Sequence, residues 1–130
     1  MKIRFYRSSD REALQSYHLT DLRFTSHPSQ AVADLENRYA ILGLEEDQIV
    51  TFLILDAGEK KFTYGGQSDS LLLRSFSTDE AFRMRGYGSQ TLKLLPDFIR
   101  EHLPMYKSII LGVNESNQVA SYLYRETGFS

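Results

Sequence analysis

The sequence has no cysteine and no tryptophan among its 130 residues. Without cysteine the chain has no disulfide framework, no thiol nucleophile and no cysteine-ligated zinc site. Its three histidines, His18, His27 and His102, are isolated, with no second histidine one helical turn away, so the sequence predicts no metal site. No apolar run approaches the length of a membrane span, and residues 1–4 do not lead into the apolar core of a signal peptide. We therefore expect a cytoplasmic protein with no membrane partner.

The chain also lacks an excess of charge of either sign. Its formal net charge is -2 and its pI is near 5.9, which argues against a general nucleic-acid binder. A hydrophobic content of 42% with 25% charged residues is ordinary for a globular protein. At 130 residues the chain is large enough for one core, so residues 1–130 are expected to form a single domain.

The spacing of apolar residues predicts strands at 2–6, 38–44, 49–56, 71–78 and 108–113. An acidic turn would join the second and third strands, and residues 57–70 would form a loop or an irregular hairpin. A helix is predicted at 89–102, with a kink at Pro96, and a last helix up to Thr127 with Gly128 as its stop.

Two further helices are expected between the first and second strands. Ser9 followed by Glu12 fits a capping box, and Ser29 would cap a short helix at 30–37. The buried face of the first of these helices would be formed by Ala13, Leu14, Tyr17 and His18. The resulting order is β-α-α-β-β-β-α-β-α, and only the helix at 89–102 has the character of a crossover between parallel strands. This order predicts an α+β fold with a mixed sheet and not a doubly wound one.

A glycine-containing loop, Arg83-Met84-Arg85-Gly86-Tyr87-Gly88-Ser89, lies between the fourth predicted strand and the helix that follows it. The first N–H groups of a helix have no intrahelical partner, and the helix dipole makes that end electropositive. Gly86 and Gly88 would let an anion approach those donors, and Arg83 and Arg85 add side chains suited to phosphate. The loop therefore predicts an anion-binding cradle.

The spacing excludes two common phosphate-binding motifs. The P-loop pattern G-x-x-x-x-G-K-[ST] is absent, and the third glycine of a dinucleotide fingerprint is replaced by Thr91. The remaining pattern, Arg-x-x-Gly-x-Gly, resembles the pyrophosphate loop of the GNAT superfamily of acyl-CoA-dependent N-acetyltransferases. An unrelated phosphate binder that shares only this loop is one alternative.

A second pattern strengthens the resemblance. The segment from Asn117 to Phe129 matches N-x-x-A-x-x-L-Y-x-x-x-G-F, which is similar to the segment that closes the cofactor half of the GNAT fold. The two patterns stand in the family's order, separated by a helix and a strand, and together they cover about the last 60 residues. The resemblance implies a GNAT-like, mostly antiparallel central sheet with helices on both faces.

The resemblance also implies which residues bind the co-substrate acetyl-CoA. N–H groups around 85–89 would hold the pyrophosphate, backbone groups of 76–78 would pair with the pantetheine arm like an added strand, and the amide of Asn117 would bind the cofactor tail. Asn117 could equally be a plain N-cap. The full set of cofactor-binding candidates is Phe76, Ser77, Thr78, Arg83, Arg85, Gly86, Tyr87, Gly88, Ser89 and Asn117.

Two residues are candidates for catalysis. By resemblance, Tyr124 would be the general acid near the thioester sulfur; the alternative is an aromatic side chain that packs in the core. A phenol with a pKa of about 10 can protonate a thiolate with a pKa of about 8.5 at modest cost. Glu80 could be the general base directly or through a water, an ordered water chain is equally open, and Asp79 is read as a charged loop residue.

The resemblance thus implies an N-acetyltransferase that moves the acetyl group of acetyl-CoA directly to a primary amine of a small molecule or peptide. The alternative is a non-catalytic acyl-CoA-binding or sensor module. The acceptor site would lie between the helices of residues 8–37 and the far side of the central strand, and Tyr17, Phe24 and His27 are candidates to line it.

The chain departs from the family pattern at its end. Family members usually continue past Gly-Phe with one strand and often another, whereas this sequence stops at Ser130. The expectation is that the C-terminal strand is missing through truncation, or that another subunit completes the sheet, which a second copy of the chain could do in a homodimer.

Overall fold

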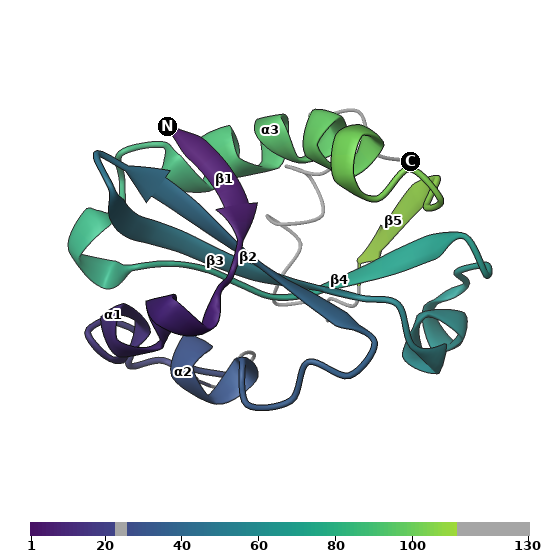
Figure 1. Cartoon of the computed structure of the whole chain (residues 1–130), viewed down its shortest axis with the longest axis horizontal. Helices are drawn as coiled ribbons and strands as arrows, with labels where there is room; N and C mark the ends of the chain where they lie inside the picture. Colours follow the sequence, from purple (N-terminus) through teal and green to yellow (C-terminus); the bar gives the residue numbers. More distant parts are fainter. Residues whose placement is uncertain (23–25, 112–130) are drawn as a thin grey trace.

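A computed structural model describes residues 1–22 and 26–111 of the chain (Figure 1). Its five strands form one sheet in the order β1-β2-β3-β4-β5. Strands β1 to β4 pair antiparallel, and β4 pairs parallel with β5. The mixed, mostly antiparallel sheet predicted from the sequence is therefore confirmed. The strands are β1 (Lys2–Phe5), β2 (Arg38–Glu45), β3 (Gln48–Asp56), β4 (Ser70–Thr78) and β5 (Ser108–Leu111).

Helices cover both faces of the sheet, as expected (Figure 1). The long helix α3 connects β4 to β5 and lies on one face, while the short helices α1 and α2 lie on the other. Among the described residues, no helix is long and apolar enough to cross a membrane. The helices are α1 (Arg11–Gln15), α2 (Pro28–Ala31) and α3 (Tyr87–His102), and three 3-10 turns are η1 (Ser8–Asp10), η2 (Glu59–Tyr64) and η3 (Glu80–Phe82).

The alternation of the strands divides the core into two clusters, one on each face. This follows from strand geometry, because successive side chains of a strand point to opposite faces of the sheet. The cluster against α3 contains Ile41, Leu53, Leu55, Leu71 and Leu73 from the sheet and Leu92, Leu95, Phe98 and Ile99 from α3. The cluster against α1 contains Ala40, Leu42, Phe52 and Ile54 from the sheet and Leu14, Tyr17 and Leu19.

The first helical segment begins differently from the prediction. The carboxylate of Asp10, not that of Glu12, reaches back to the N-cap of η1 and accepts a hydrogen bond from the backbone N–H of Arg7 at 2.8 Å. Asp10 is also held by both terminal nitrogens of Arg4, at 2.8 Å each. The capping box predicted at Ser9 and Glu12 is therefore wrong. The carboxylate of Asp10 caps this segment instead, because Arg4 on β1 holds it in place.

The predicted buried face of this helix is half correct. Leu14 and Tyr17 are buried, whereas Ala13 and His18 are exposed. Because α1 ends at Gln15, the residues after it no longer follow helical spacing.

The second helix also has a different cap from the one expected. It begins at Pro28, and the ring of His27, not the hydroxyl of Ser29, occupies the N-cap position and accepts from the N–H of Ser29. Proline suits this place, since the first turn of a helix needs no donor from it.

The strands match the sequence-based bounds to within one residue at each end, apart from the last one, of which the structure describes Ser108–Leu111. Glu46 and Asp47 form the predicted acidic turn between β2 and β3, and both have positive φ angles, of 50° and 67°. Helix α3 continues through Pro96 as one helix up to His102. The expectations for Asn117, for Tyr124 and for a helix up to Thr127 lie outside the described residues.

Candidate functional site

Strand β4 contains a bulge in the middle of the sheet. Ser77 lies opposite Phe52 and Arg74 opposite Ile54, so two residues of β4 face a single residue of β3. Ser75, at this point, has a φ of 57°, which is rare for a residue other than glycine. Bulges of this kind bend a strand and change the direction of its side chains. The bulge therefore divides β4 into an inner half, residues 70–74, and an outer half, residues 76–78.

Within the described residues, the inner half of β4, before the bulge, pairs with β5, and the outer half, after the bulge, extends past this described pairing. The parallel register joins Ser70 to Ser108 and continues to Leu73 and Leu111, the last residue of β5 that the structure describes. Strand β4 itself continues past the bulge to Thr78. Residues 76–78 of β4 are those predicted from the sequence to pair with the pantetheine arm.

The glycine loop lies directly against this outer half. Gly86 is the N-cap of α3 with a φ of 79°, a conformation that glycine adopts without strain. A Cβ added to Gly88 would lie 3.3 Å from Oγ1 of Thr78 and 3.5 Å from Cζ of Phe76. A Cβ added to Gly86 would approach Nε2 of Gln90 only to 3.8 Å, so the space above the helix end is open. The structure thus brings four of the predicted cofactor-binding residues together.

The two arginines of the loop are exposed, and each is oriented by a neighbour. Nη2 of Arg83 lies 3.6 Å from Oε2 of Glu80, and the guanidinium of Arg85 lies over the ring of Phe82, 5.5 Å from its centroid. The ring of Tyr87 also contacts Phe82, with 6.4 Å between centroids. Both cations therefore stand beside the start of α3, where they can meet an anion bound there.

A buried pair of threonines fixes the start of α3 to the sheet. Oγ1 of Thr91 donates to the carbonyl of Tyr87 at 2.8 Å and accepts from Oγ1 of Thr51 on β3 at 2.7 Å. Both threonines are fully buried. Gly43 on β2 leaves room for this pair, because a Cβ there would collide with Oγ1 of Thr51. Ser89, in the same first turn, is half-buried.

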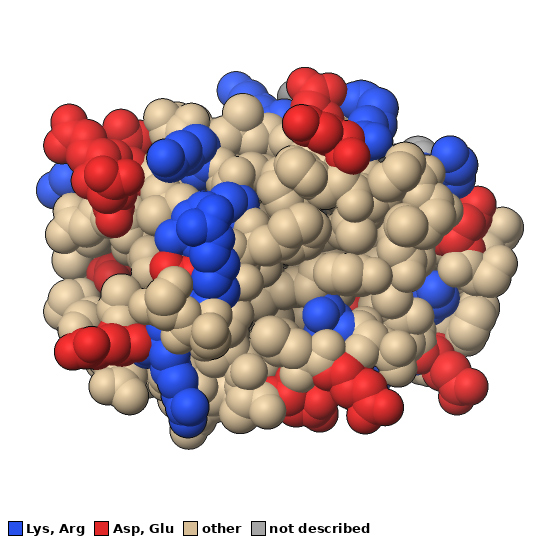
Figure 2. Space-filling model, in the orientation of Figure 1, with Lys and Arg blue, Asp and Glu red and all other residues tan. Residues whose placement is uncertain are grey.

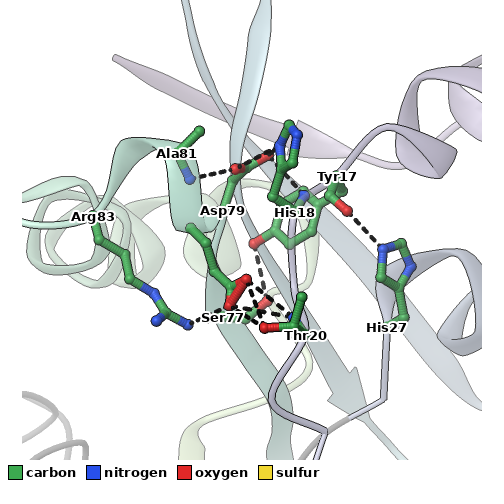
Figure 3. A network of polar contacts seen from close by, with 9 residues as sticks. Tyr17, His18, Thr20, His27, Ser77, Asp79, Ala81 and Arg83 are labelled. Carbon is green, nitrogen blue, oxygen red and sulfur yellow. Dashed lines mark hydrogen bonds and ion pairs between the residues drawn. The ribbon is translucent and has the colours of Figure 1, made fainter.

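On the opposite face of β4, the side chain of Ser77 meets Tyr17 (Figure 3). The two hydroxyl oxygens are 2.9 Å apart. Tyr17 is buried, and this burial raises the pKa of its phenol, so that the hydroxyl stays protonated. The backbone of Ser77 is part of the predicted cofactor strand, whereas its side chain lies on the face of the sheet that packs against α1.

Asp79, which the sequence analysis reads as a charged loop residue, lies just after β4 and is buried, where its carboxylate anchors two segments (Figure 3). Its carboxylate accepts from the backbone N–H of His18 at 3.1 Å and from that of Ala81 at 2.8 Å. Nδ1 of His18 lies 3.2 Å from Oδ1 of Asp79. The segment after α1 is therefore tied to the end of the central strand.

Glu80, the candidate general base, takes part in the same connection. Its carboxylate accepts from the backbone N–H and from the hydroxyl of Thr20 at 3.0 to 3.2 Å, and it forms an ion pair with Arg83. Its own N–H donates to the carbonyl of His18 at 2.8 Å. Its role as a general base stays a prediction. To accept a proton from an amine or a water, the carboxylate would have to give up some of its contacts with Thr20 and Arg83.

His27 ties the start of α2 to the segment that follows α1. Its Nδ1 accepts from the N–H of Ser29 at 3.1 Å, which leaves Nε2 as the protonated nitrogen that donates to the carbonyl of Tyr17 at 2.7 Å. Phe24, the third candidate to line the acceptor site, lies outside the described residues, as do the cofactor candidate Asn117 and the catalytic candidate Tyr124.

A cluster of two arginines and one aspartate lies on the face of the sheet that packs against α1, and sequence reasoning did not single it out. Oδ2 of Asp56 is 3.1 Å from Nη1 of Arg74 and 3.3 Å from Nε of Arg38. No motif marks these residues; the signal that could have found them is the pairing of β2, β3 and β4, which places them on one face.

The face shown in Figure 2 carries acidic and basic side chains in small groups around a broad uncharged area.

Comparison with known proteins agrees with this arrangement. Residues 4–129 match the model of the acetyltransferase (GNAT) family. The chain is 34% identical over 135 residues to the uncharacterized N-acetyltransferase YbbJ of Bacillus subtilis strain 168, covering 99% of this chain and 84% of that protein.

Solved structures also share the fold, among them two acetyltransferases. A Bacillus subtilis acetyltransferase in complex with CoA superposes with a TM-score of 0.68 at 14% identity, covering 98% of this chain and 74% of that one. The aminoglycoside N-acetyltransferase AAC(6')-Iy, in complex with the bisubstrate analog CoA-S-monomethyl-acetylneamine, gives a TM-score of 0.69 at 16% identity, with coverage of 99% and 90%.

Proposed function

The chain belongs to the GNAT acetyltransferase family, and on this premise we propose that it transfers the acetyl group of acetyl-CoA directly to a primary amine. The acceptor would be a small molecule or a peptide. The observation that carries the proposal is the glycine-bearing start of α3 packed against the outer half of β4, with Gly88 in contact with Phe76 and Thr78.

The residues at this place fit the chemistry of CoA. The pyrophosphate is an anion, and the start of α3 offers N–H groups without intrahelical partners, a positive dipole end and no capping side chain at Gly86 within the described residues. Arg83 and Arg85 add charge at the rim. The pantetheine arm carries amides, and residues 76–78 lie on β4 past the described part of its pairing with β5, where an added strand could exchange main-chain hydrogen bonds with it.

The reaction requires three things of the protein. A neutral amine must attack the thioester carbonyl, the oxyanion that forms must be stabilised, and the sulfur must leave with a proton while the amine loses one. Backbone N–H groups at the bulge of β4 are suited to the second task, because they are held rigidly by the sheet. Glu80 would take the amine proton directly or through water, and Tyr124 would protonate the sulfur.

Calorimetric titration with CoA, acetyl-CoA and ATP tests the cofactor part of this proposal. We expect both CoA species to bind and ATP not to reproduce that binding. Gly86→Glu should abolish binding, since it places a carboxylate on the cradle and forces a side chain into a positive φ. Gly65→Glu is the matched control, because Gly65 has a φ of 85° with nothing within 4 Å of its added Cβ and lies in the turn after η2.

Turnover with an amine panel tests the catalytic part. Tyr124→Phe should keep CoA binding and lose most of the acetyl transfer. If the unaltered chain binds CoA and acetylates no amine, it is a binding module and not an enzyme. If neither CoA species binds, the proposal as a whole fails.

A further inference from the structure

The position of Arg74 bears on the acceptor. Arg74 is the last residue of β4 before the bulge and lies opposite Ile54, whose side chain packs in the cluster against α1. Ser77, the first residue after the bulge, lies opposite Phe52 of the same cluster. Arg74 and Ser77 therefore flank the bulge on the same face of the sheet, away from α3. That face is the side from which the amine would approach.

Asp56 holds Arg74 in place. Asp56 is buried, with 5% of its surface exposed, and it is diagonal to Arg74 across the β3–β4 ladder. It accepts one hydrogen bond from Nη1 of Arg74, whereas a guanidinium has five donors. Its other oxygen accepts from the N–H of Gly58 at 2.8 Å, which fixes the carboxylate itself. About a third of the Arg74 side chain, 32%, remains exposed.

The charges in this cluster do not cancel. Among residues 1–22 and 26–111, Arg38 and Arg74 share the one carboxylate of Asp56, which leaves one positive charge in excess on a half-buried surface. A structural ion pair would need only one of the two arginines. An oriented guanidinium loses little conformational freedom when it binds a planar anion, so it is suited to recognise a carboxylate by two parallel hydrogen bonds.

We propose that Arg74 binds a carboxylate of the acceptor, so that the substrate is an amino carboxylate such as an amino acid and not a polycationic amine. This inference rests on the proposed acetyl transfer and names its substrate class. The same positive charge would disfavour the ammonium form of the nearby amine, which must be neutral to attack.

The test compares acceptors that differ only in the carboxylate. The chain with acetyl-CoA is assayed with the common L-amino acids, with their carboxamides and with an aminoglycoside as a cationic comparator. The best amino acid should exceed its carboxamide by at least about tenfold in kcat/KM, as expected for a charged hydrogen bond. Arg74→Gln should remove most of this preference, mainly through KM, and change the value for the carboxamide by less than about twofold.

Three variants separate recognition from stability. Arg74→Lys keeps the charge and loses the fork, so it should recover only part of the preference. Arg38→Gln removes the other arginine from Asp56 and with it the excess charge, but it keeps the fork of Arg74, so it should lower the preference less than Arg74→Gln does. Gly86→Glu should lose CoA binding and transfer for all acceptors alike. Calorimetric titration of each Arg74 and Arg38 variant with CoA establishes that it is folded.

The inference is overturned if carboxamides or the aminoglycoside are acetylated as well as amino acids, or if Arg74→Gln lowers transfer to all acceptors equally. Titration of the chain–CoA complex with the same amino acids decides it independently of turnover, because an absence of binding by every amino carboxylate also overturns it. The proposed function stands or falls separately, by CoA binding and by acetylation of any amine.

Discussion

The buried pair Thr51 and Thr91 allows a sharp prediction about how α3 is held to the sheet. Thr91 donates to the carbonyl of Tyr87, so it can only accept from Thr51, and Thr51 must be the donor between them. Thr51→Val removes that donor and leaves Thr91 with a partner, which should cost about 1 kcal/mol. Thr91→Val leaves the hydroxyl of Thr51 buried without its acceptor, which should cost about 2 kcal/mol.

The double variant distinguishes this interpretation from simple packing. When both hydroxyls are replaced by methyl groups, no polar side chain stays unpaired, and the carbonyl of Tyr87 keeps the helical N–H of residue 91 as a partner. The double variant should therefore be no less stable than Thr91→Val alone, although the two single effects add to about 3 kcal/mol.

Urea unfolding of the four proteins measures these free energies. Thr63→Val, at an exposed position in η2, is the control and should change stability by less than about 0.5 kcal/mol. If the costs of the two single variants add within about 0.5 kcal/mol, the hydroxyls are not coupled and the reasoning is refuted.

Two further predictions concern pH. The hydrogen bond from Arg4 lowers the pKa of Asp10, so the free energy of unfolding should fall as the pH drops below about 4 and through the lowered native pKa. Asp10→Asn should cost about 2 kcal/mol at neutral pH and make the stability less dependent on pH in this acid range. If urea unfolding shows the same loss of stability with acid for both proteins, the prediction is contradicted. Burial raises the pKa of Tyr17, so the native state keeps a proton that the unfolded chain loses above about pH 10, and stability should fall there. Tyr17→Phe should cost about 1 kcal/mol at neutral pH by losing the contact with Ser77, and thermal unfolding should show a flatter alkaline limb than that of the unaltered chain.

Much of the fold could be predicted because its signals are local. The alternation of apolar residues indicated the strands, and the glycine loop indicated where α3 begins, since only Gly86 takes up a positive φ at that N-cap without strain. The caps of the first two helices were mispredicted. Ser9 and Ser29 are good capping residues in isolation, but Asp10 and His27 have partners elsewhere in the chain that decide the outcome, namely Arg4 on β1 and the carbonyl of Tyr17.

The residues predicted to bind the cofactor were easier to find from the sequence than those predicted to line the acceptor site. Gly86, Gly88, Phe76 and Thr78 lie in or next to one continuous pattern, and the structure places them together. The roles given to them, and to Glu80, Asn117 and Tyr124, stay predictions.

The sequence by itself determined the strands, the glycine-bearing start of α3 and the family. These depend on residue type and spacing within short segments, where backbone conformation and the helix dipole dominate. Only the tertiary structure decided the bulge at Ser75, the Tyr17–Ser77 contact and the sharing of Asp56 by Arg38 and Arg74. Each of these depends on the register between strands or on contacts between distant segments, and a shift of one residue would turn every side chain of a strand to the other face.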